Sequence, residues 1–223
     1  MKANKGFTLV EMLVVISVLS LFGIVALTIF SRTLVGSNKS KIILAMKQNG
    51  QSVLETIDST IRNASLVLCP SPNSTSTILV VVNNGVYTRF KFIDPVTVYT
   101  DSTNQIIDDT KSKNSAIQED FPVPLGDINQ FKNNVCSAAN PLPVQLVNAV
   151  VLTDTNPQSG VSVSNPGFTR DTKPGFKDII KINFVLSQGM NAPPIIAGQI
   201  DPVTFATTVQ LRKSIEILVS SSQ

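Results

Sequence analysis

The most marked hydrophobic pattern in the sequence lies near its start. Residues Phe7 to Phe30 are almost continuously apolar, with one acidic side chain, Glu11, inside the run. From Met12 to Ser31 no residue carries a charge, and this stretch of 20 residues is long enough to cross about 30 Å of hydrocarbon as an α-helix. The pattern therefore predicts a membrane-spanning helix. Glu11 needs its own explanation, because a carboxylate at the centre of a bilayer costs about 2.5–3.5 kcal/mol.

Two simpler interpretations of this segment are a cleaved secretory signal and a plain signal-anchor helix. A secretory signal has an apolar core of about 7–15 residues before a small-x-small cleavage site. Here the run is longer and leads into Phe30-Ser31-Arg32-Thr33, which lacks such a site. A signal-anchor stays an alternative. Basic residues flank both ends of the segment and so do not set its orientation: Lys2, Lys5, Arg32, Lys39 and Lys41.

The residues at the start of the run form a motif. Lys5-Gly6-Phe7-Thr8-Leu9-Val10-Glu11 resembles the class III signal of type IV prepilins and type II secretion pseudopilins, which combines a short basic leader, a glycine, a phenylalanine and a glutamate at the fifth mature position. The resemblance covers the leader and the first helix. It implies cleavage between Gly6 and Phe7 by the prepilin peptidase, a membrane aspartyl peptidase on the cytoplasmic face, and N-methylation of Phe7.

The same resemblance implies a location and a set of partners. A protein of this kind would be a single-pass protein of the inner membrane with its C-terminal domain extracytoplasmic, and would then enter a filament. Its partners would be the prepilin peptidase and methyltransferase, other pilin or pseudopilin subunits, and an inner-membrane assembly platform with its motor ATPase.

The chemistry of Glu11 fits such a filament subunit. In an apolar bundle of helices a buried carboxylate needs a positive partner, because an unpaired buried charge is expensive. The amine of a neighbouring subunit's Phe7, kept cationic by methylation, is the natural candidate, and this pairing would set the axial register. The simpler interpretation is that Glu11 favours the positive end of its helix and reaches the headgroups. Both remain open from the sequence.

The helical pattern continues beyond the membrane segment. No proline occurs before Pro70, although the chain has 13 prolines, and Cys69-Pro70-Ser71-Pro72 is expected to end the helix near Leu68. Many major pilins carry a proline near the middle of the membrane segment, where this chain has only Gly23 and Thr28. After Ser31 the apolar positions form one stripe, as in a helix with one buried face: Ile43, Met46, Val53, Ile57, Ile61, Ala64 and Leu68.

The C-terminal two-thirds of the chain has the short alternating runs of β-strands. Ile78–Asn83 and Val86–Ile93 are joined by Asn84-Gly85, a strong hairpin signal, and in the second run Tyr87, Arg89 and Lys91 share a face opposite to Phe90. Three more runs predict strands: 145–153, 178–186 and 205–219. Several strands after one long helix predict an α+β, type IV pilin-like fold with an antiparallel sheet on the helix.

Between these runs, 101–120 and 154–177 are expected to be long polar connections. Asp101, Asp108 and Asp109 could offer oxygen ligands to calcium, which some pseudopilins bind, but the spacing is not that of an EF-hand and a solvated loop is the expectation. No other cofactor is expected. The stretch from Phe205 to Arg212 also resembles the closing strand of the larger minor pseudopilins, the J-type or W-type subunits, and equally suits any amphipathic strand.

Composition narrows the classes of function. The chain has no histidine, which excludes Ser-His-Asp, Cys-His and histidine-based zinc sites. Lys and Arg total 18 against 15 acidic residues, and loss of Lys2 and Lys5 would leave 16, so no strong basic field argues for nucleic acid. The two cysteines, Cys69 and Cys136, lack C-x-x-C spacing; a disulfide and two buried free thiols both remain open.

We therefore expect a non-enzymatic structural subunit, minor rather than major, of a type IV pilus or pseudopilus. The alternative is a membrane-anchored adhesin or DNA-uptake binding module of a pilus-like machine. The expected division of the chain is a cleaved leader (1–6), a transmembrane and filament-core helix (7–31), its amphipathic continuation (32–68) and a β-rich domain (69–223).

Overall fold

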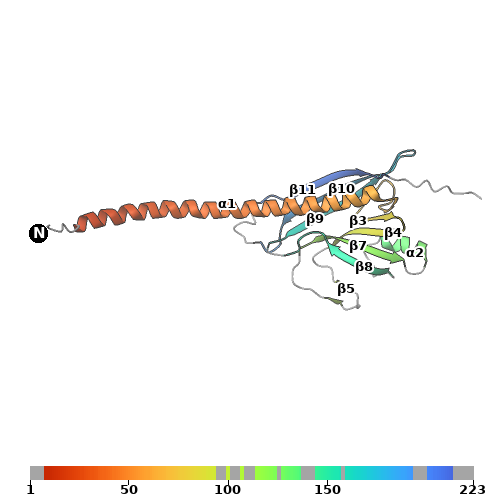
Figure 1. The fold of residues 1–223 in the computed structure, drawn as a ribbon, viewed down its shortest axis with the longest axis horizontal. Coiled ribbons are helices and arrows are strands. Elements are labelled where there is room, and N and C mark those ends of the chain that lie inside the picture. The colour runs from red at the N-terminus through yellow and green to blue at the C-terminus, as the bar shows by residue number, and fades with distance from the viewer. Residues whose placement is uncertain are drawn as a thin grey trace, which may run out of the picture. The chain divides into compact units, whose positions relative to one another are not determined.

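The computed structural model describes residues 8–93, 99–100, 106–107, 114–124, 127–136, 144–156, 159–192 and 200–212. The chain divides into two compact units, Met1–Lys41 and Ile42–Gln223. One element, the 55-residue helix α1 (Leu9–Asn63), contributes its first part to the first unit and the rest to the second (Figure 1).

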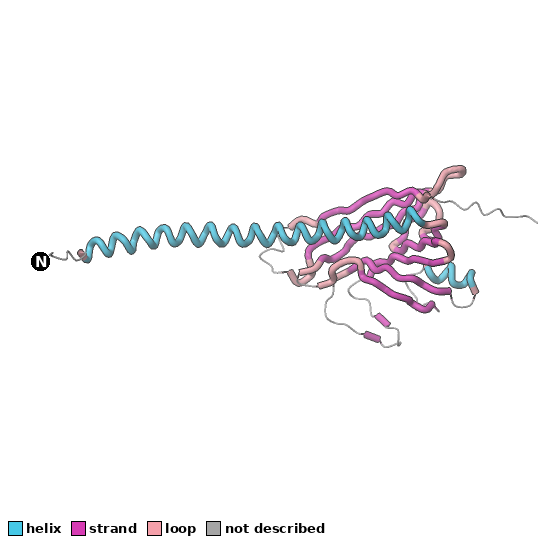
Figure 2. Tube along the Cα trace, viewed as in Figure 1, coloured by secondary structure: helices cyan, strands magenta, loops and turns pink. Residues whose placement is uncertain are grey.

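The described part of the second unit is built from two main antiparallel sheets and a short helix, α2 (Ile128–Val135) (Figure 2). The five-stranded sheet has the order β1-β3-β4-β7-β8: Leu66–Cys69, Ile78–Asn83, Val86–Ile93, Ala116–Pro124 and Val144–Val151. The four-stranded sheet has the order β11-β10-β9-β2: Val203–Gln210, Ile179–Gln188, Val161–Asp171 and Ser74–Ser76. A two-stranded pair consists of β5 (Tyr99–Thr100) and β6 (Ile106–Ile107).

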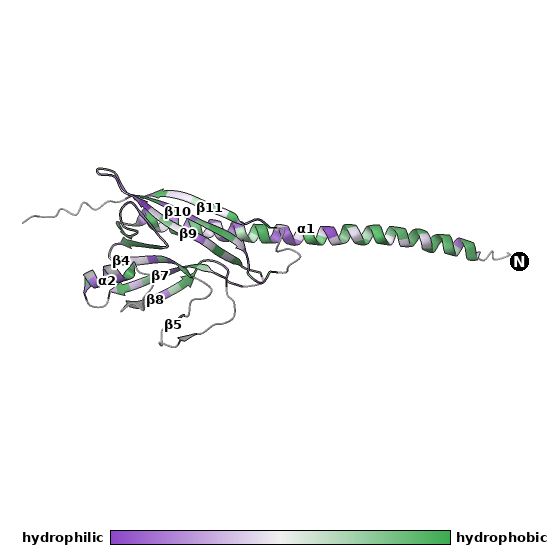
Figure 3. Ribbon diagram, turned by 180° about the vertical axis from the view of Figure 1, so that it is seen from behind, coloured by the Kyte–Doolittle hydropathy of each residue, from purple (hydrophilic) through white to green (hydrophobic). Residues whose placement is uncertain are grey.

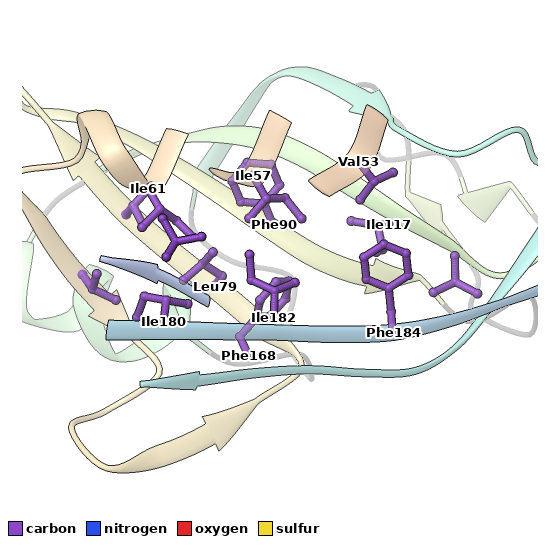
Figure 4. Packing of buried hydrophobic residues seen from close by; sticks show 14 of the residues in the cluster. Val53, Ile57, Ile61, Leu79, Phe90, Ile117, Phe168, Ile180, Ile182 and Phe184 are labelled. Carbon is purple, nitrogen blue, oxygen red and sulfur yellow. The ribbon is translucent and has the colours of Figure 1, made fainter. Parts of the chain in front are cut away.

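The main core lies between α1 and the two sheets. Val53, Ile57 and Ile61 recur at spacings of four residues on one face of α1, and each is fully buried. They belong to one hydrophobic cluster with side chains from both sheets (Figure 4): from the five-stranded sheet Val67, Leu79, Val81, Phe90 and Ile117, and from the four-stranded sheet Val161, Val163, Phe168, Ile180, Ile182, Phe184, Leu186 and Val209. This arrangement confirms the predicted α+β class with a long helix packed on antiparallel sheets.

A second, smaller core lies on the other face of the five-stranded sheet. Along β3, Leu79 and Val81 enter the main core, whereas the alternate residues Ile78 and Val80 pack with α2. On that side the rings of Tyr87 and Phe131 meet edge to face, with centroids 4.8 Å apart and planes at 75°. The five-stranded sheet is thus covered on both faces.

The predicted hairpin is confirmed. Its strands Ile78–Asn83 and Val86–Ile93 are β3 and β4, and they pair from Ile78↔Lys91 to Asn83↔Val86. The turn residues Asn84 and Gly85 have φ of 49° and 81°, as a type I′ turn requires.

The predicted end of the first helix is wrong. α1 ends at Asn63, and Leu66–Cys69 forms the edge strand β1, not a last helical turn. Ser65 leaves the helix by donating both its backbone N–H and its hydroxyl to the carbonyl of Val82, at 2.8 and 2.9 Å. Pairing of Leu66 with Val82 and Val67 with Val81 outweighs the helical periodicity, because a sheet contact distant in sequence is invisible to a local pattern.

Both predicted long connections contain strands. β9 lies inside 154–177, and β7 takes up the end of 101–120. The sequence did not predict β9, because it contains Asn165-Pro166-Gly167, which is typical of a loop. In the structure these residues lie at an irregularity in the pairing with β10, between Asn183 and Val185, and Asn165 has a φ of 48°. The last predicted strand, 205–219, corresponds to β11, which begins two residues earlier, at Val203, and ends at Gln210; residues 213–219 lie outside the described residues.

Candidate processing and assembly site

Of the residues in the predicted processing motif, the structure describes those from Thr8 onward. Gly6 and Phe7, the expected cleavage pair, lie outside the described residues. Thr8 directly precedes the first helical residue, Leu9, and Glu11 lies in the first turn of α1. The part of the motif that the structure describes is therefore the first turn of α1.

Thr8 and Glu11 form a reciprocal set of hydrogen bonds. Glu11 Oε2 accepts from the backbone N–H of Thr8 at 2.9 Å and from its hydroxyl at 3.0 Å, and the backbone N–H of Glu11 donates to Thr8 Oγ1 at 3.3 Å. This is a capping box, which satisfies N–H groups that have no partner within the helix. Sequence reasoning missed it, although Thr-x-x-Glu before an apolar run is its usual signature.

The capping box gives Glu11 a role besides the predicted pairing with a neighbouring subunit. The carboxylate is held by its own chain, so Glu11 has a local structural role at the helix start. However, Thr8 supplies only neutral donors, and the negative charge itself has no cation among the described neighbours that contact it. A charged partner is still needed if this end of α1 enters an apolar environment.

From Met12 to Phe30, the part of α1 that follows Glu11 carries no charged residue and is mostly hydrophobic (Figure 3). Its large hydrophobic side chains are exposed, from 80% for Leu9 to 45% for Val18. Within the described part of the chain, α1 is the one helix long and apolar enough to span a membrane, with a mean hydropathy of 2.8 in its most apolar window. A helix that is hydrophobic all round needs lipid or other helices around it.

The few polar side chains of this segment are satisfied within the helix. The hydroxyls of Ser17, Ser20 and Thr28 donate to the carbonyls of Val14, Ile16 and Ile24, at 2.7–2.9 Å. Such bonds to the preceding turn remove the need for water in an apolar environment. Hydroxyls in the run are therefore compatible with burial in a membrane or a helical bundle.

The motif is matched by comparison with known families. The family model of the prokaryotic N-terminal methylation motif matches residues 1–27. The chain thus carries a type IV pilin-like prepilin signal, on a membrane-type apolar helix and in a pilin-like α+β arrangement. The match ends within the apolar helix and does not extend to the β-rich part. The chain has no significant match among curated proteins or solved structures.

The two cysteines lie together in the second unit. Cys69 ends β1, Cys136 follows α2, and the structure joins them in a disulfide with the Cα atoms 5.8 Å apart. The bridge links α2 to the five-stranded sheet and borders the smaller core of Ile78, Val80 and Phe131. Its position indicates a structural role.

The predicted calcium ligands cannot be placed. Asp101, Asp108 and Asp109 lie outside the described residues. Among the residues that are described, no group of three or more Cys, Asp or Glu side chains is arranged to hold a metal ion.

A buried charge cluster on β4 and β7 was not foreseen. Arg89, on the face of β4 opposite to Phe90, has a side chain only 3% exposed, which donates through Nε and Nη2 to Asp120, at 2.8 and 2.7 Å. Asp120 is fully buried, and Lys91 Nζ lies 3.3 Å from it. Burial lowers the pKa of Lys91, and the Asp120 charge opposes that shift. Burial also raises the pKa of neighbouring Glu119, to which the negative charge of Asp120 contributes.

Proposed function

We propose that this chain is a minor subunit of a type IV pilus or pseudopilus. The observation that carries the proposal is the match of residues 1–27 to the N-terminal methylation motif, which continues into an apolar helix whose described large hydrophobic side chains are exposed. The activity is assembly rather than catalysis. The product would be a filament whose core is a bundle of such helices.

In this function the chain passes through three states. The prepilin peptidase removes 1–6 by cutting between Gly6 and Phe7, and Phe7 is N-methylated. The mature chain is held in the inner membrane by 7–31 with its C-terminal domain outside the cytoplasm. An assembly platform driven by a motor ATPase then moves it into the filament alongside other subunits.

Glu11 is proposed to register the subunit in the filament. The capping box supplies two neutral hydrogen bonds to its carboxylate, which leaves a full negative charge among apolar side chains once the bundle forms. The methylated amine at Phe7 of the neighbouring subunit would neutralise that charge. Thr8 would hold the Glu11 carboxylate in position until the Phe7 amine of the neighbouring subunit pairs with it.

Two features favour a minor subunit. The membrane part of the helix lacks the proline that many major pilins carry, and Gly23, which lies there, is embedded in regular helix. The strand from Phe205 to Gln210 is the outermost strand of the four-stranded sheet and has the pattern of the closing strand in J-type or W-type pseudopilins. The first feature is a difference from many major pilins and the second is a resemblance to the larger minor pseudopilins, and together they support a minor subunit.

The deciding experiment combines processing and fractionation. Mass spectrometry of the chain in sheared filaments should show an N-methylated Phe7 as the first residue, and Gly6→Ala should leave the leader attached and the protein in the membrane fraction. Gly23→Ala is the matched control for cleavage, because it lies away from the cleavage pair and, apart from its own stretch of helix, no atom lies within 4 Å of the added methyl group in the single chain. An intact Met1 in filament material would reject the prepilin assignment. A mature protein that stays entirely with membranes would instead favour the anchored adhesin or DNA-uptake module.

A further inference from the structure

The loop between β9 and β10 presents an aromatic side chain at the tip of a rigid turn. Lys173-Pro174-Gly175-Phe176 closes with a hydrogen bond from Phe176 N–H to the carbonyl of Lys173, at 3.0 Å, and Gly175 has a φ of 78°. Proline at the second position and a left-handed glycine at the third define a type II turn. The loop projects beyond the ends of the strands it joins (Figure 2).

Phe176 has no packing role that explains it. Its side chain is 75% exposed, more than any other large apolar side chain described in the second unit, and it belongs to neither hydrophobic cluster. A single exposed hydrophobic residue is ordinary on a protein surface. Here, however, the ring stands on a hydrogen-bonded turn, and the same loop carries Lys173 and Lys177.

The charges around the turn are unequal. The acidic residues at its base are both engaged: Asp178 binds Arg170 at 2.5 Å, and Asp171 binds Lys181 at 2.6 Å. Within the described residues, Lys173, Lys177 and Arg212 have no carboxylate within ion-pair distance, and the Lys177 ammonium donates to the carbonyl of Arg212. The loop therefore carries two lysines, Lys173 and Lys177, that form no ion pair with a described carboxylate, and Lys177 bonds to the backbone of a third cationic residue, Arg212.

The base of the loop is braced, which keeps the tip in place. Arg170 donates to the carbonyls of Val67 and Pro70, at 2.8 and 3.3 Å, as well as binding Asp178. On the other side Thr172 N–H donates to the side-chain oxygen of Asn73, at 3.0 Å. The tip therefore needs little ordering when it binds.

We propose that the Lys173–Lys177 tip binds the surface of an anionic phospholipid bilayer. Phe176 would enter the interface between headgroups and acyl chains, and Lys173, Lys177 and Arg212 would lie against the phosphates. Nucleic acid fits less well, because a single strand needs a cationic track with successive stacking rings, whereas this tip offers one ring with a lysine on each side in the loop. This binding does not depend on filament assembly.

The chain offers a clean probe, since it contains no tryptophan. Phe176→Trp in the full-length protein, held in nanodiscs of phosphatidylcholine, places the only indole at the tip. Added vesicles of phosphatidylcholine with phosphatidylglycerol should shift its emission to the blue, and brominated acyl chains should quench it. Val86→Trp is the matched control, because Val86 is 56% exposed beside the Asn84-Gly85 turn and should show neither effect.

The contributions of charge and of apolar contact to membrane binding are separated by substitutions at the tip. For each variant, the affinity of the same nanodiscs for the anionic vesicles is measured. Lys173→Gln and Lys177→Gln should each weaken binding about fivefold, the equivalent of about 1 kcal/mol per cation at an anionic surface, and Phe176→Ser should abolish the salt-resistant part. Lys47→Gln, at an exposed lysine of α1, should change nothing. Equal responses of Phe176→Trp and Val86→Trp, or quenching of the Phe176→Trp indole by a single-stranded oligonucleotide but not by brominated vesicles, would overturn the proposal.

Discussion

Gly50 of α1 lies directly against the ring of Phe205 on β11, so closely that a Cβ atom on Gly50 would overlap the ring carbons. Phe205 in turn stacks on Phe184, with centroids 5.4 Å apart and planes at 15°. The glycine is therefore a packing requirement in the middle of a helix, where alanine has the better intrinsic propensity by about 1 kcal/mol.

Gly50→Ala should destabilise the protein despite that gain in helix propensity. Overpacking of a filled core costs about 1–3 kcal/mol, and the ring that the added methyl group would meet is itself stacked on Phe184. Thermal unfolding of the full-length protein in mild detergent measures the effect, and Phe205→Leu in the same chain should recover part of the loss. Gly36→Ala, where nothing lies within 4 Å, is the control. Unchanged or higher stability of Gly50→Ala would show that β11 does not pack on α1 in this way.

The buried charges on β4 and β7 predict an asymmetry between two substitutions. Asp120→Asn would leave both Arg89 and Lys91 without their shared carboxylate and should cost about 3–5 kcal/mol, whereas Arg89→Met leaves Asp120 beside Lys91 and should cost less. The double variant Arg89→Met with Asp120→Leu should recover much of the loss. Chemical unfolding measures all three. Asp58→Asn, which breaks the partly exposed pair with Arg62 on α1, should cost less than about 1 kcal/mol; an equally small effect of Asp120→Asn would contradict the buried pairing.

Glu119 predicts a pH dependence. Burial and the adjacent Asp120 raise the pKa of Glu119 above its ordinary value of 4.5, so the folded state favours the protonated form. Its contribution to stability is fully present below that ordinary value and is lost as pH rises through the raised pKa. Glu119→Gln, which stays neutral, should therefore be more stable than the parent protein at neutral pH and should lose this advantage in acid. Unfolding at both pH values is the measurement, with Glu55→Gln, an exposed site on α1, as control. A constant difference across pH would refute the argument.

The parts of the fold that the sequence predicted are those set by local patterns. The apolar stripe through Val53 and Ile57 and the turn at Asn84-Gly85 depend on neighbours in the chain, and both are found as expected. β1 and β9 depend on partners distant in sequence, and their local signals pointed to a helix and a loop. The burial of Arg89 could not be predicted for the same reason. The alternating pattern assigned Arg89 to its face of β4, but its buried partner Asp120 lies 31 residues away in the sequence.

The Cys69–Cys136 disulfide is expected to stabilise the folded protein and to fix α2 to the five-stranded sheet. The two cysteines are 67 residues apart, and closing a loop of that length stabilises the folded state by about 4 kcal/mol in the chain-entropy model. Cys69→Ala with Cys136→Ala should lose a stability of that order and should speed hydrogen exchange in Ile128–Val135 more than in α1. Peptide mapping without reductant should recover Cys69 and Cys136 linked. Free alkylation of both thiols in the native protein would reject the bridge and leave core packing as their role.

The two roles of Glu11 can be separated by three substitutions at the capping box. Glu11→Ala removes the charge and the cap, Glu11→Gln removes the charge but keeps hydrogen bonding to Thr8, and Thr8→Val removes the hydroxyl but keeps the charge. Thr8→Val should weaken the helix start by about 1 kcal/mol and should still assemble. Both Glu11 variants should insert into the membrane at least as well as the parent, because a costly charge is removed from the apolar run.

Co-assembly with wild-type subunits then decides the matter. If Glu11 neutralises the amine of a neighbour's Phe7, Glu11→Ala and Glu11→Gln should both be depleted from sheared filaments, since neither offers a negative charge in the bundle. Entry of both variants at wild-type levels would leave Glu11 as a capping residue alone, and equal depletion of Thr8→Val and Glu11→Gln would place the requirement in the cap. N-methylation must be measured in the same samples, because a methyltransferase that needs the glutamate would also deplete the Glu11 variants from filaments. The charge pairing is supported only by variants that are methylated and still fail to assemble.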